Sequence, residues 1–560
     1  MKLKALIAVA LIACFIPLQA ISLTLTKRQL CDLELILEGG FSPLKGFLDR
    51  KNYETVVSKM CLADGTLWPI PITLDVDREA ACRIKPGDKV QLQNEQGVPL
   101  AIIHVSDMWT PDKSKEALHV YGTTDHAHPG VSYLLEKTHD TYIGGEVSAL
   151  NPMIYYEFAD LRKTPSELKA YFREKGIKKV VAFQTRNPLH RAHVALTKIA
   201  TAMTGAHLLI HPVVGETKEG DIDPYTRVRC YRKILKYFPE NQTTLALLPL
   251  AMRMAGPREA LWHAIIRKNY GCTHFIIGRD HAGPGVGSNG KPFYDPYEAQ
   301  NLVKLHAKEI GIEVVSLPEV VFVKEQNDYL PVTEVQPGMT ELKISGTELR
   351  RCLQSNLEIP EWFSYPEVIS ELQKINPSRS EQGFTLFFTG LSGSGKSTLI
   401  NALNERLREV QYRPVTLLDG DIIRRNLSSE LGFSAKDRST NVRRVGFVAS
   451  EITKHKGIAL CALIAPYEQD RLANRHSIET VGGYIEIYLS TPLETCEKRD
   501  IKGLYSKARD GIIKNFTGIN DPYQPPIHPE LEIDTTHLSV KEAVDQIIDF
   551  LTKEKYIEPV

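Results

Sequence analysis

A glycine-rich segment in the C-terminal third of the chain leaves few folds open to the residues around it. Gly390-Leu-Ser-Gly-Ser-Gly-Lys-Ser397 fits the pattern GxxxxGK[ST], with an apolar run from Phe384 to Thr389 before it and a predicted helix from Thr398 to Val410 after it. Glycines let backbone N–H groups turn inward around phosphate oxygens, and the helix N-terminus adds positive partial charge. Because a strand and a helix flank the segment, we interpret it as a P-loop that binds a nucleotide and not as a chance glycine-rich turn.

The acids that follow the loop fit nucleotide chemistry. We expect Lys396 to reach the β- and γ-phosphates and Ser397 to hold Mg²⁺. Asp419 and Asp421 end the next predicted strand, where two carboxylates can activate an acceptor hydroxyl or position the metal. The residues predicted to bind ATP here are Gly390, Leu391, Ser392, Gly393, Ser394, Gly395, Lys396, Ser397 and Thr398.

A basic segment comes next and contains Arg424, Arg438, Asn441 and Arg443. Several guanidinium groups beside a P-loop favour a second anionic substrate, because arginine binds oxyanions with a rigid fork of donors. A solvated basic helix face is the alternative interpretation of the same residues.

Earlier in the chain, residues 156–325 alternate strands with helices. A helix is predicted over 166–175, a strand over 179–183 and a further helix from Leu189. This alternation predicts a doubly wound parallel sheet, in which ligands bind beyond the carboxyl ends of the strands. Further strands are predicted to begin at Leu208, Thr244 and Thr273.

Two polar clusters follow strands of this predicted sheet, the segments 184–193 and 277–285. In the first, Gln184 and Arg186 offer donors to an oxyanion, and His190 and His193 share a face at a helix start, where imidazoles suit polyphosphate. A metal is a second interpretation, although no third ligand follows at a recognisable spacing, and a purely structural pair is a third. The second cluster, Ile277-Gly-Arg-Asp-His-Ala-Gly-Pro-Gly285, lets glycine-rich backbone approach a ligand closely.

Short strand-like runs, broken by turn signals, predict a mainly β, barrel-like domain at the N-terminus, with strands near 89–92 and 100–105. A polar stretch with Pro, Ser and Gly, residues 375–383, is a linker candidate between two α/β patterns. We therefore predict four domains: 1–155, mainly β; 156–325, α/β; 326–375, a small α/β segment; and 383–560, the P-loop domain.

Composition narrows the classes of partner and compartment. Lys+Arg and Asp+Glu are equal at 68 each, which argues against a general affinity for nucleic acid or an anionic membrane, so any anion site must be local.

Nine cysteines without a CxxC pair fit reduced thiols better than a disulfide framework or a zinc site. Met1-Lys-Leu-Lys and the apolar run from Ala5 to Leu18 are typical of a signal peptide and are short for a membrane span; a buried N-terminal segment is the alternative. Because the rest of the chain is expected to use ATP, we predict a cytoplasmic protein.

The P-loop, the segment from Asp419 to Arg444, and the later stretches 502–509 and 515–523 closely resemble the adenylylsulfate (APS) kinase family over about residues 383–555. The resemblance implies a P-loop kinase that transfers the γ-phosphoryl group of ATP to the 3′-hydroxyl of APS, giving PAPS, with Asp419 as the base. It implies that Lys502 and Arg509 lie in a mobile lid and that Phe516 lies near the adenine of APS. The residues implied to bind APS are Asp419, Asp421, Arg424, Arg438, Asn441, Lys502 and Phe516.

One position departs from that family. Many APS kinases carry Ile-Ser-Pro where this chain has Ile464-Ala-Pro466. A phosphorylated intermediate is excluded at Ala465, but direct transfer requires only positioning and charge stabilisation, so we still expect kinase activity.

The two polar clusters of the α/β region, together with further stretches, resemble the ATP sulfurylase family over roughly residues 22–372. The resemblance implies a PUA-like N-terminal domain, a Rossmann-like nucleotidyltransferase domain, and attack of sulfate on the α-phosphorus of ATP to give APS and pyrophosphate. The further matching stretches lie at 31–36, 39–44, 212–221, 252–257, 344–350 and 358–366.

Residue roles follow from this resemblance by position. It implies that Gln184, Arg186 and the backbone of Ala282 bind sulfate and that His190 and His193 grip the β- and γ-phosphates. A valine beside the adenine is implied at Val320 or Val321. The residues implied as catalytic are Thr185, Arg186 and Asn187. The residues implied to bind ATP are Gln184, Asn187, His190, His193, Gly278, Arg279, Asp280, His281 and Val320.

We therefore expect a bifunctional enzyme that uses ATP, sulfate and APS with Mg²⁺, binds neither nucleic acid nor membrane, and assembles as a dimer or hexamer by resemblance. The main alternative is a sulfurylase whose C-terminal domain only binds PAPS and regulates, as fungal sulfurylases with a degraded P-loop do. The intact P-loop and the Asp419/Asp421 pair favour catalysis. A sulfurylase run in reverse, making ATP, and an exported binding protein are further alternatives.

Overall fold

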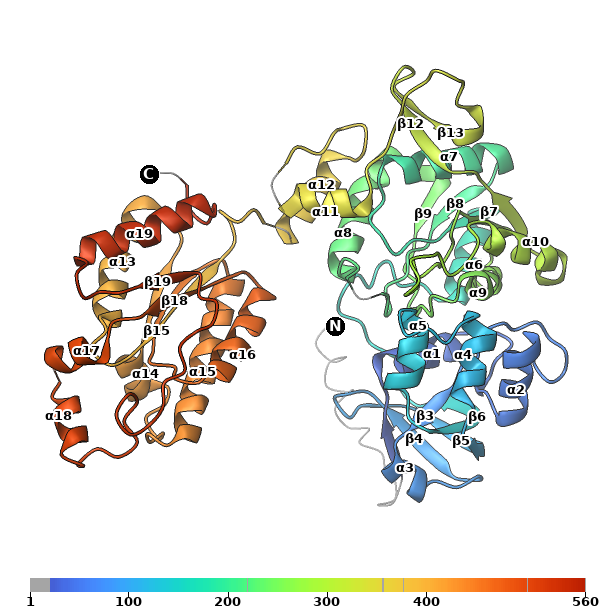
Figure 1. The fold of residues 1–560 in the computed structure, drawn as a ribbon. Coiled ribbons are helices and arrows are strands. Elements are labelled where there is room, and N and C mark those ends of the chain that lie inside the picture. The colour runs from blue at the N-terminus through green and yellow to red at the C-terminus, as the bar shows by residue number, and fades with distance from the viewer. Residues whose placement is uncertain (1–20, 219, 355–356, 376, 501, 559–560) are drawn as a thin grey trace, which may run out of the picture. The chain divides into compact units, whose positions relative to one another are not determined.

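The structure is a computed structural model that describes residues 21–218, 220–354, 357–375, 377–500 and 502–558. The signal-like N-terminal run lies outside these residues. The chain divides into two compact units, Met1–Ile344 with Ile359–Leu372 and Ser345–Glu358 with Gln373–Val560, and each is described by itself (Figure 1).

The first unit begins with a six-stranded, mainly antiparallel sheet in the order β1-β4-β5-β6-β2, with β3 paired to β6. The predicted strands near 89–92 and 100–105 are confirmed, while the helices packed around this sheet are not part of that prediction. Phe41, Trp68 and Tyr142 are fully buried in its core. Its strands are β1 Ser22–Thr24, β2 Gly46–Phe47, β3 Leu74–Val76, β4 Lys89–Gln93, β5 Pro99–Trp109 and β6 Thr141–Ala149. Its helices are α1 Lys27–Leu37, α2 Arg50–Lys59, α3 Arg78–Arg83, α4 Lys113–Tyr121 and α5 Pro129–Ser132.

A five-stranded parallel sheet in the order β11-β10-β7-β8-β9 follows, which confirms the predicted doubly wound architecture. Every residue of β7, β8 and β10 is buried, as expected of parallel strands covered by helices on both faces. The strands are β7 Val180–Phe183, β8 His207–Ile210, β9 Thr243–Leu245, β10 His274–Ile277 and β11 Glu313–Ser316. The helices are α6 Pro165–Glu174, α7 Arg191–Thr204, α8 Pro224–Ile234, α9 Gly256–Asn269 and α10 Glu298–Ile310.

A small antiparallel sheet in the order β13-β12-β14 comes next along the chain, and two helices follow it. These elements are β12 Val320–Val323, β13 Asp328–Pro331, β14 Glu341–Leu342, α11 Gly346–Gln354 and α12 Pro366–Ile375.

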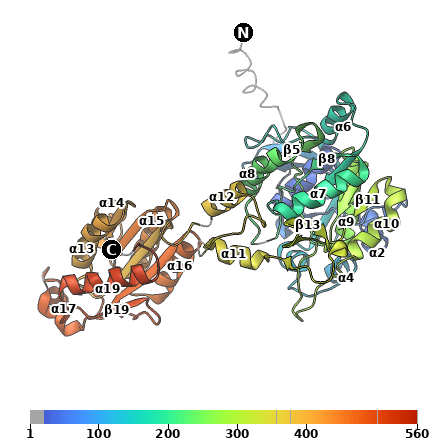
Figure 2. The same cartoon turned by 90° about the horizontal axis from the view of Figure 1, so that it is seen from above.

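The second unit contains a parallel sheet in the order β16-β17-β15-β18-β19. Its central strand alternates: Phe384, Leu386 and Phe388 pack with α13 and α19, whereas Phe387 packs with α15 and α16 on the opposite face (Figure 1, Figure 2). This period of two is the one a strand imposes on its side chains. The strands are β15 Phe384–Gly390, β16 Val415–Asp419, β17 Ile458–Ala462, β18 Gly483–Leu489 and β19 Leu531–Ile533. The helices are α13 Lys396–Val410, α14 Gly420–Asn426, α15 Ala435–Lys454, α16 Glu468–Glu479, α17 Leu493–Arg499, α18 Leu504–Arg509 and α19 Val540–Lys553.

Two global features bear on the predictions from composition. Among the described residues, no helix is long and apolar enough to cross a membrane. The eight cysteines that the structure describes form no disulfide with one another.

Two candidate active sites

The first candidate site lies beyond the carboxyl ends of β7 and β10. These strands are neighbours in the sheet, so the segments 184–187 and 278–282 start from the same edge. The two polar clusters, 184–193 and 277–285 in the sequence, thus lie at one edge of the sheet, where ligands bind in open parallel sheets.

The turn after β7 is held by its own side chains and by α8. The Thr185 hydroxyl donates to the carbonyl oxygen of Asn187 at 2.9 Å and accepts from the Asn187 N–H at 3.0 Å. Arg227, 1% exposed, donates to the carbonyl oxygen of Arg186 at 2.9 Å, and Tyr231 donates to that of Asn187 at 2.9 Å. Arg227 and Tyr231 are not among the residues predicted from the sequence; the signal that could have identified them is their spacing of four residues, which places both on one face of a helix.

Two side chains of this turn are suited to an oxyanion. Nη1 of Arg186 lies 2.6 Å from Oδ2 of Asp221, and its other guanidinium nitrogens make no hydrogen bond or ion pair with the residues that the structure describes, so they can turn to a ligand. The buried amide oxygen of Gln184 has no hydrogen-bond partner within the described chain. If this amide is rotated by 180°, its NH₂ group takes the place of the unpaired oxygen and can donate to an oxyanion bound there.

The two histidines lie at the start of α7 and bind each other. His190 is the N-cap residue, its N–H donates to Nδ1 of His193 at 3.1 Å, and its own Nδ1 lies 2.8 Å from the hydroxyl of Ser364. Burial lowers the pKa of His190 to about 3 and that of His193 to about 4, so both imidazoles are neutral at pH 7 without a ligand.

The loop after β10 has an unusual backbone. Asp280 and Ala282 have φ values of 53° and 57°, a left-handed conformation that non-glycine residues rarely adopt. Such strain is typical of functional loops. Nε2 of His281 lies 3.1 Å from Nδ1 of His263, and Nε2 of His263 lies 3.3 Å from Oε1 of the fully buried Glu259.

The remaining predicted residues of this site differ in exposure. Arg279 forms an ion pair with Glu319 at 3.4 Å, and space is open around the Cα of Gly278. Of the two valines proposed beside the adenine, Val321 is 2% exposed in the core, whereas Val320 is only partly buried and so offers a surface.

The second candidate site is the P-loop between β15 and α13. Gly393 and Gly395 have φ values of 78° and 98°, and a Cβ on Gly393 would lie 2.9 Å from the carbonyl oxygen of Cys496. Glycine is therefore required at position 393, both for its conformation and for the close approach of Cys496. Nζ of Lys396 donates to the carbonyl oxygens of Gly390 at 2.9 Å and Leu391 at 2.7 Å, and burial lowers its pKa to about 8.

Oxygen ligands converge beside this loop. The Ser397 hydroxyl donates to Oδ2 of Asp419 at 2.5 Å, and Oδ1 of Asp419 accepts from the N–H of Asp421 at 2.9 Å. Lys502 forms an ion pair with Asp421. The structure thus brings together Ser397, Asp419, Asp421 and Lys502, four residues that the sequence places in three separate segments.

The predicted acceptor-binding residues on α14 and α15 have partners of several kinds. Arg438, 7% exposed, contacts Thr517 and lies 2.6 Å from Oδ2 of Asp521, and the buried amide oxygen of Asn441 has no hydrogen-bond partner in the part of the chain described. Arg424 instead donates to the carbonyl oxygen of Gly432 at 2.9 Å.

The predicted lid residues have partners as well. Arg509 pairs with Glu497 at 2.6 Å, and the ring of Phe516 lies 5.0 Å from that of Tyr505 in an edge-to-face contact. Tyr505 in turn donates to the P-loop carbonyl of Ser392 at 2.8 Å. Thr398, in the first turn of α13, is exposed.

Three family models match the chain in order: PUA-like domain at residues 18–152, ATP-sulfurylase at 159–375 and adenylylsulphate kinase at 382–534. A sulfate adenylyltransferase from Gibberella zeae is 51% identical over 530 residues, which cover 94% of this chain and 92% of the relative. A sulfate adenylyltransferase from Emericella nidulans is 50% identical over 541 residues, which cover 96% and 94%.

A solved structure described as a hexameric APS kinase from Thiobacillus denitrificans is also similar. It is 39% identical with a TM-score of 0.78, and the match covers 97% of this chain and 95% of that chain. The similarity therefore extends through both units. The chain belongs to the family of ATP sulfurylases that carry an adenylylsulfate kinase domain at their C-terminal end.

Proposed function

We propose that this chain activates sulfate in two successive reactions that each consume ATP. A sulfate oxygen attacks the α-phosphorus of ATP, which gives APS and pyrophosphate. The 3′-hydroxyl of APS then attacks the γ-phosphorus of a second ATP, which gives PAPS and ADP. The observation that carries this proposal is that one chain holds two anion-binding clusters, each at the end of a strand in its own parallel sheet.

In the sulfurylase site, Gln184, Arg186 and the backbone of Ala282 bind sulfate, and Thr185 and Asn187 shape the turn that holds Arg186 in place. Sulfate is a charged and poor nucleophile, so the task of the site is to hold two anions together and to neutralise developing charge. No covalent nucleophile is required.

The nucleotide of this first reaction lies between the histidines and the loop after β10. His190 and His193 bind the β- and γ-phosphates, whose negative charge would raise both imidazole pKa values and favour the protonated rings. The other residues that we assign to ATP are Gly278, Arg279, Asp280, His281 and Val320.

In the kinase site, Asp419 accepts the proton of the attacking hydroxyl and Lys396 neutralises the transferred phosphoryl group. Arg438 and Asn441 bind APS, because one carries a buried guanidinium and the other a buried amide oxygen that has no hydrogen-bond partner among the described residues. Asp421, Arg424, Lys502 and Phe516 complete the APS site in this proposal.

The oxygen atoms beside the P-loop fit Mg²⁺. Mg²⁺ in nucleotide sites takes one or two protein oxygens and completes its shell with phosphates and water, and the Ser397 hydroxyl and the Asp419 carboxylate lie 2.5 Å apart. The described residues contain no cluster of three or more ligands of the kind that would bind a metal by protein groups alone. When bound, Mg²⁺ would neutralise charge on the phosphate oxygens.

The wider organisation is part of the proposal. We assign residues 1–155 to the N-terminal domain, 156–325 to the sulfurylase catalytic domain, 326–375 to a small domain and 383–560 to the kinase. Assembly as a dimer or hexamer is supported by the similar structure described as hexameric. Use of ATP in both reactions supports a cytoplasmic location.

A second candidate function is a sulfurylase whose C-terminal domain binds PAPS without catalysis. It is favoured by one observation: the relatives from Gibberella zeae and Emericella nidulans, about half identical to this chain, carry the name sulfate adenylyltransferase alone. The intact Lys396 and the Ser397–Asp419 contact favour catalysis instead.

Labelled sulfate, ATP, Mg²⁺ and pyrophosphatase decide between the two candidates in one assay. Labelled PAPS would establish both activities on one chain. Labelled APS as the sole product would support the regulatory alternative, and the absence of both products would refute the sulfurylase assignment.

A further inference from the structure

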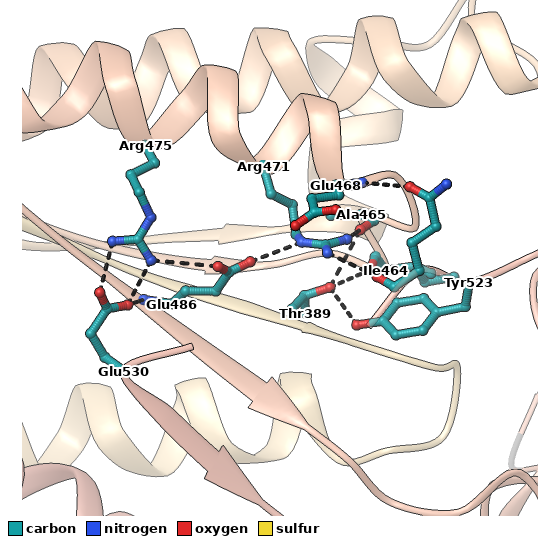
Figure 3. A network of polar contacts seen from close by, with 10 residues as sticks. Thr389, Ile464, Ala465, Glu468, Arg471, Arg475, Glu486, Tyr523 and Glu530 are labelled. Atoms are coloured by element: carbon teal, nitrogen blue, oxygen red, sulfur yellow. Dashed lines mark hydrogen bonds and ion pairs between the residues drawn. The ribbon is translucent and has the colours of Figure 1, made fainter. Parts of the chain in front are cut away.

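Arg471 is a buried arginine on α16 that contacts one strand and two loops of the kinase domain (Figure 3). Its Nε lies 2.8 Å from Oε1 of Glu486 on β18, and its side chain is 2% exposed. Its Nη1 donates to the carbonyl oxygen of Ala465 at 2.7 Å, and its Nη2 donates to that of Gln524 at 2.8 Å. One guanidinium therefore joins a helix, a strand and two loop segments in a region shielded from water.

The first of these loops is the turn after β17. Ala465 has a φ of 44°, a left-handed conformation that is held only where its surroundings impose it. Thr389, which directly precedes the P-loop, donates to the carbonyl oxygen of Ile464 at 2.7 Å. Arg471 and Thr389 therefore hold the same turn from two sides, as Figure 3 shows.

The second loop contacts Arg438, a residue assigned to the acceptor site. Gln524 follows Asp521, whose carboxylate lies 2.6 Å from Nη2 of Arg438 and accepts from the Tyr467 hydroxyl at 3.1 Å. The N–H of Gln524 donates to the carbonyl oxygen of Pro466 at 2.9 Å, so the two loops also contact each other. Residues 518–523 line an open pocket of about 510 Å³ together with Leu391 of the P-loop and the end of β18.

The same network contains a second arginine that makes no such loop contacts. Arg475 lies 2.7 Å and 2.8 Å from the two carboxylate oxygens of Glu530 and 3.5 Å from Glu486. Its other contacts in the described chain go to Glu479 and the ring of Tyr484. Arg475 is therefore a matched control for Arg471, since both neutralise buried carboxylates but only Arg471 binds loop carbonyls.

We propose that Arg471 is a positioning residue for the acceptor pocket of the kinase: by binding the carbonyl oxygens of Ala465 and Gln524, it holds the loop that carries Asp521 and thereby sets the place of Arg438. The inference rests on the proposed kinase function. It adds to that function a residue that touches neither substrate.

Lysine substitutions at both arginines test it. A lysine at 471 keeps a positive charge beside Glu486, but a single ammonium cannot reproduce the two further bonds of the fork. We expect Arg471→Lys to raise the Kd for APS, measured by equilibrium binding with ADP present, and the KM for APS at least tenfold. The KM for ATP in the kinase reaction should change less than threefold. Arg475→Lys should leave the Kd for APS within twofold, and APS formation from sulfate should be unchanged in both variants.

A double variant tests the same inference if Arg471→Lys does not fold. Arg471→Met with Glu486→Gln removes both charges together, keeps the network neutral, and should show the same loss of APS affinity. An unchanged Kd for APS in a folded Arg471 variant would overturn the inference, as would an equal loss in the Arg471 and Arg475 variants. An unaltered chain that binds no APS would instead refute the kinase function, and the inference with it.

Discussion

Lys396→Met separates the stability of the P-loop from its chemistry. Burial lowers the pKa of Lys396 from 10.5 to about 8, which corresponds to roughly 3 kcal/mol of unfavourable free energy for the ammonium at pH 7, at about 1.4 kcal/mol per pKa unit. The side chain is only partly buried, so we discount this to about 2 kcal/mol for solvent screening. Methionine removes that penalty together with two hydrogen bonds, to the carbonyl oxygens of Gly390 and Leu391, worth about 1 kcal/mol each. The free energy of unfolding should therefore change by less than about 1 kcal/mol.

Activity should respond very differently from stability. Removing a preorganised positive charge from the transferred phosphoryl group should lower the rate of PAPS formation by about 10²–10³-fold. APS formation should stay within twofold, because its residues belong to the other sheet. The assay is labelled sulfate with ATP, Mg²⁺ and pyrophosphatase, beside denaturant unfolding of the same protein. Lys454→Met, at the exposed end of α15, is the matched control and should change neither product.

The pH dependence of stability gives a second readout. Because the folded pKa of Lys396 is below its unfolded value, the unfolded chain binds more protons between about pH 8 and 10.5, and this group stabilises the fold as the pH rises through that window. The methionine variant should lack that gain. A loss of more than about 2 kcal/mol in the variant, or PAPS formation above about one tenth of the parent rate, would refute the reasoning.

Three further predictions concern other residues of the two sites. Arg186→Ala should lower APS formation from labelled sulfate by about 10²–10³-fold and leave PAPS formation from supplied APS unchanged; normal sulfate turnover would show that the sulfate site lies elsewhere. Asp419→Asn should lower the rate of PAPS formation by about 10²–10⁴-fold, and a rate near that of the parent would exclude Asp419 as the base. Because burial holds the pKa values of His190 and His193 at about 3 and about 4, below the unfolded value, the ligand-free protein should lose stability as the pH falls from 6.5 to 5, by about 2 kcal/mol for each ring. Between pH 6.5 and 5, the free energy of unfolding measured by urea titration should fall less in His193→Asn than in the parent. An equal fall in both proteins would contradict the assignment of this pH dependence to the buried imidazole.

The two parallel sheets could be predicted because their strands leave a local signal. In β15 every residue from Phe384 to Gly390 is buried, and the P-loop glycines follow at a fixed place in the chain. The sheet edge then determines where the polar clusters meet, so Gln184 and His281 could be assigned to one site without any knowledge of their contacts.

Contacts between distant side chains could not be predicted, because no periodicity encodes them. Arg471 binds Gln524 fifty-three residues away, and Arg186 binds Asp221 thirty-five residues away. The left-handed φ of Ala465 could not be predicted from the sequence either, because alanine, unlike glycine, does not indicate such a turn. Helix α1 differs, because Thr26 and Gln29 form a capping box whose Thr-x-x-Gln pattern is visible in the sequence and marks the start of the helix.

The contacts behind His281 determine where its proton lies. Glu259 accepts the N–H groups of Arg253 and Ala255 at 2.9 Å and 2.8 Å and keeps a lowered pKa, so it is a carboxylate, and Nε2 of His263 must carry hydrogen to face it. Burial lowers the pKa of His263, so its ring is neutral and its Nδ1 carries a lone pair, to which Nε2 of His281 must donate. In this tautomer of the neutral ring, Nδ1 of His281 carries a lone pair, and that lone pair repels an oxyanion. An anion that binds this ring must therefore be taken up together with a proton.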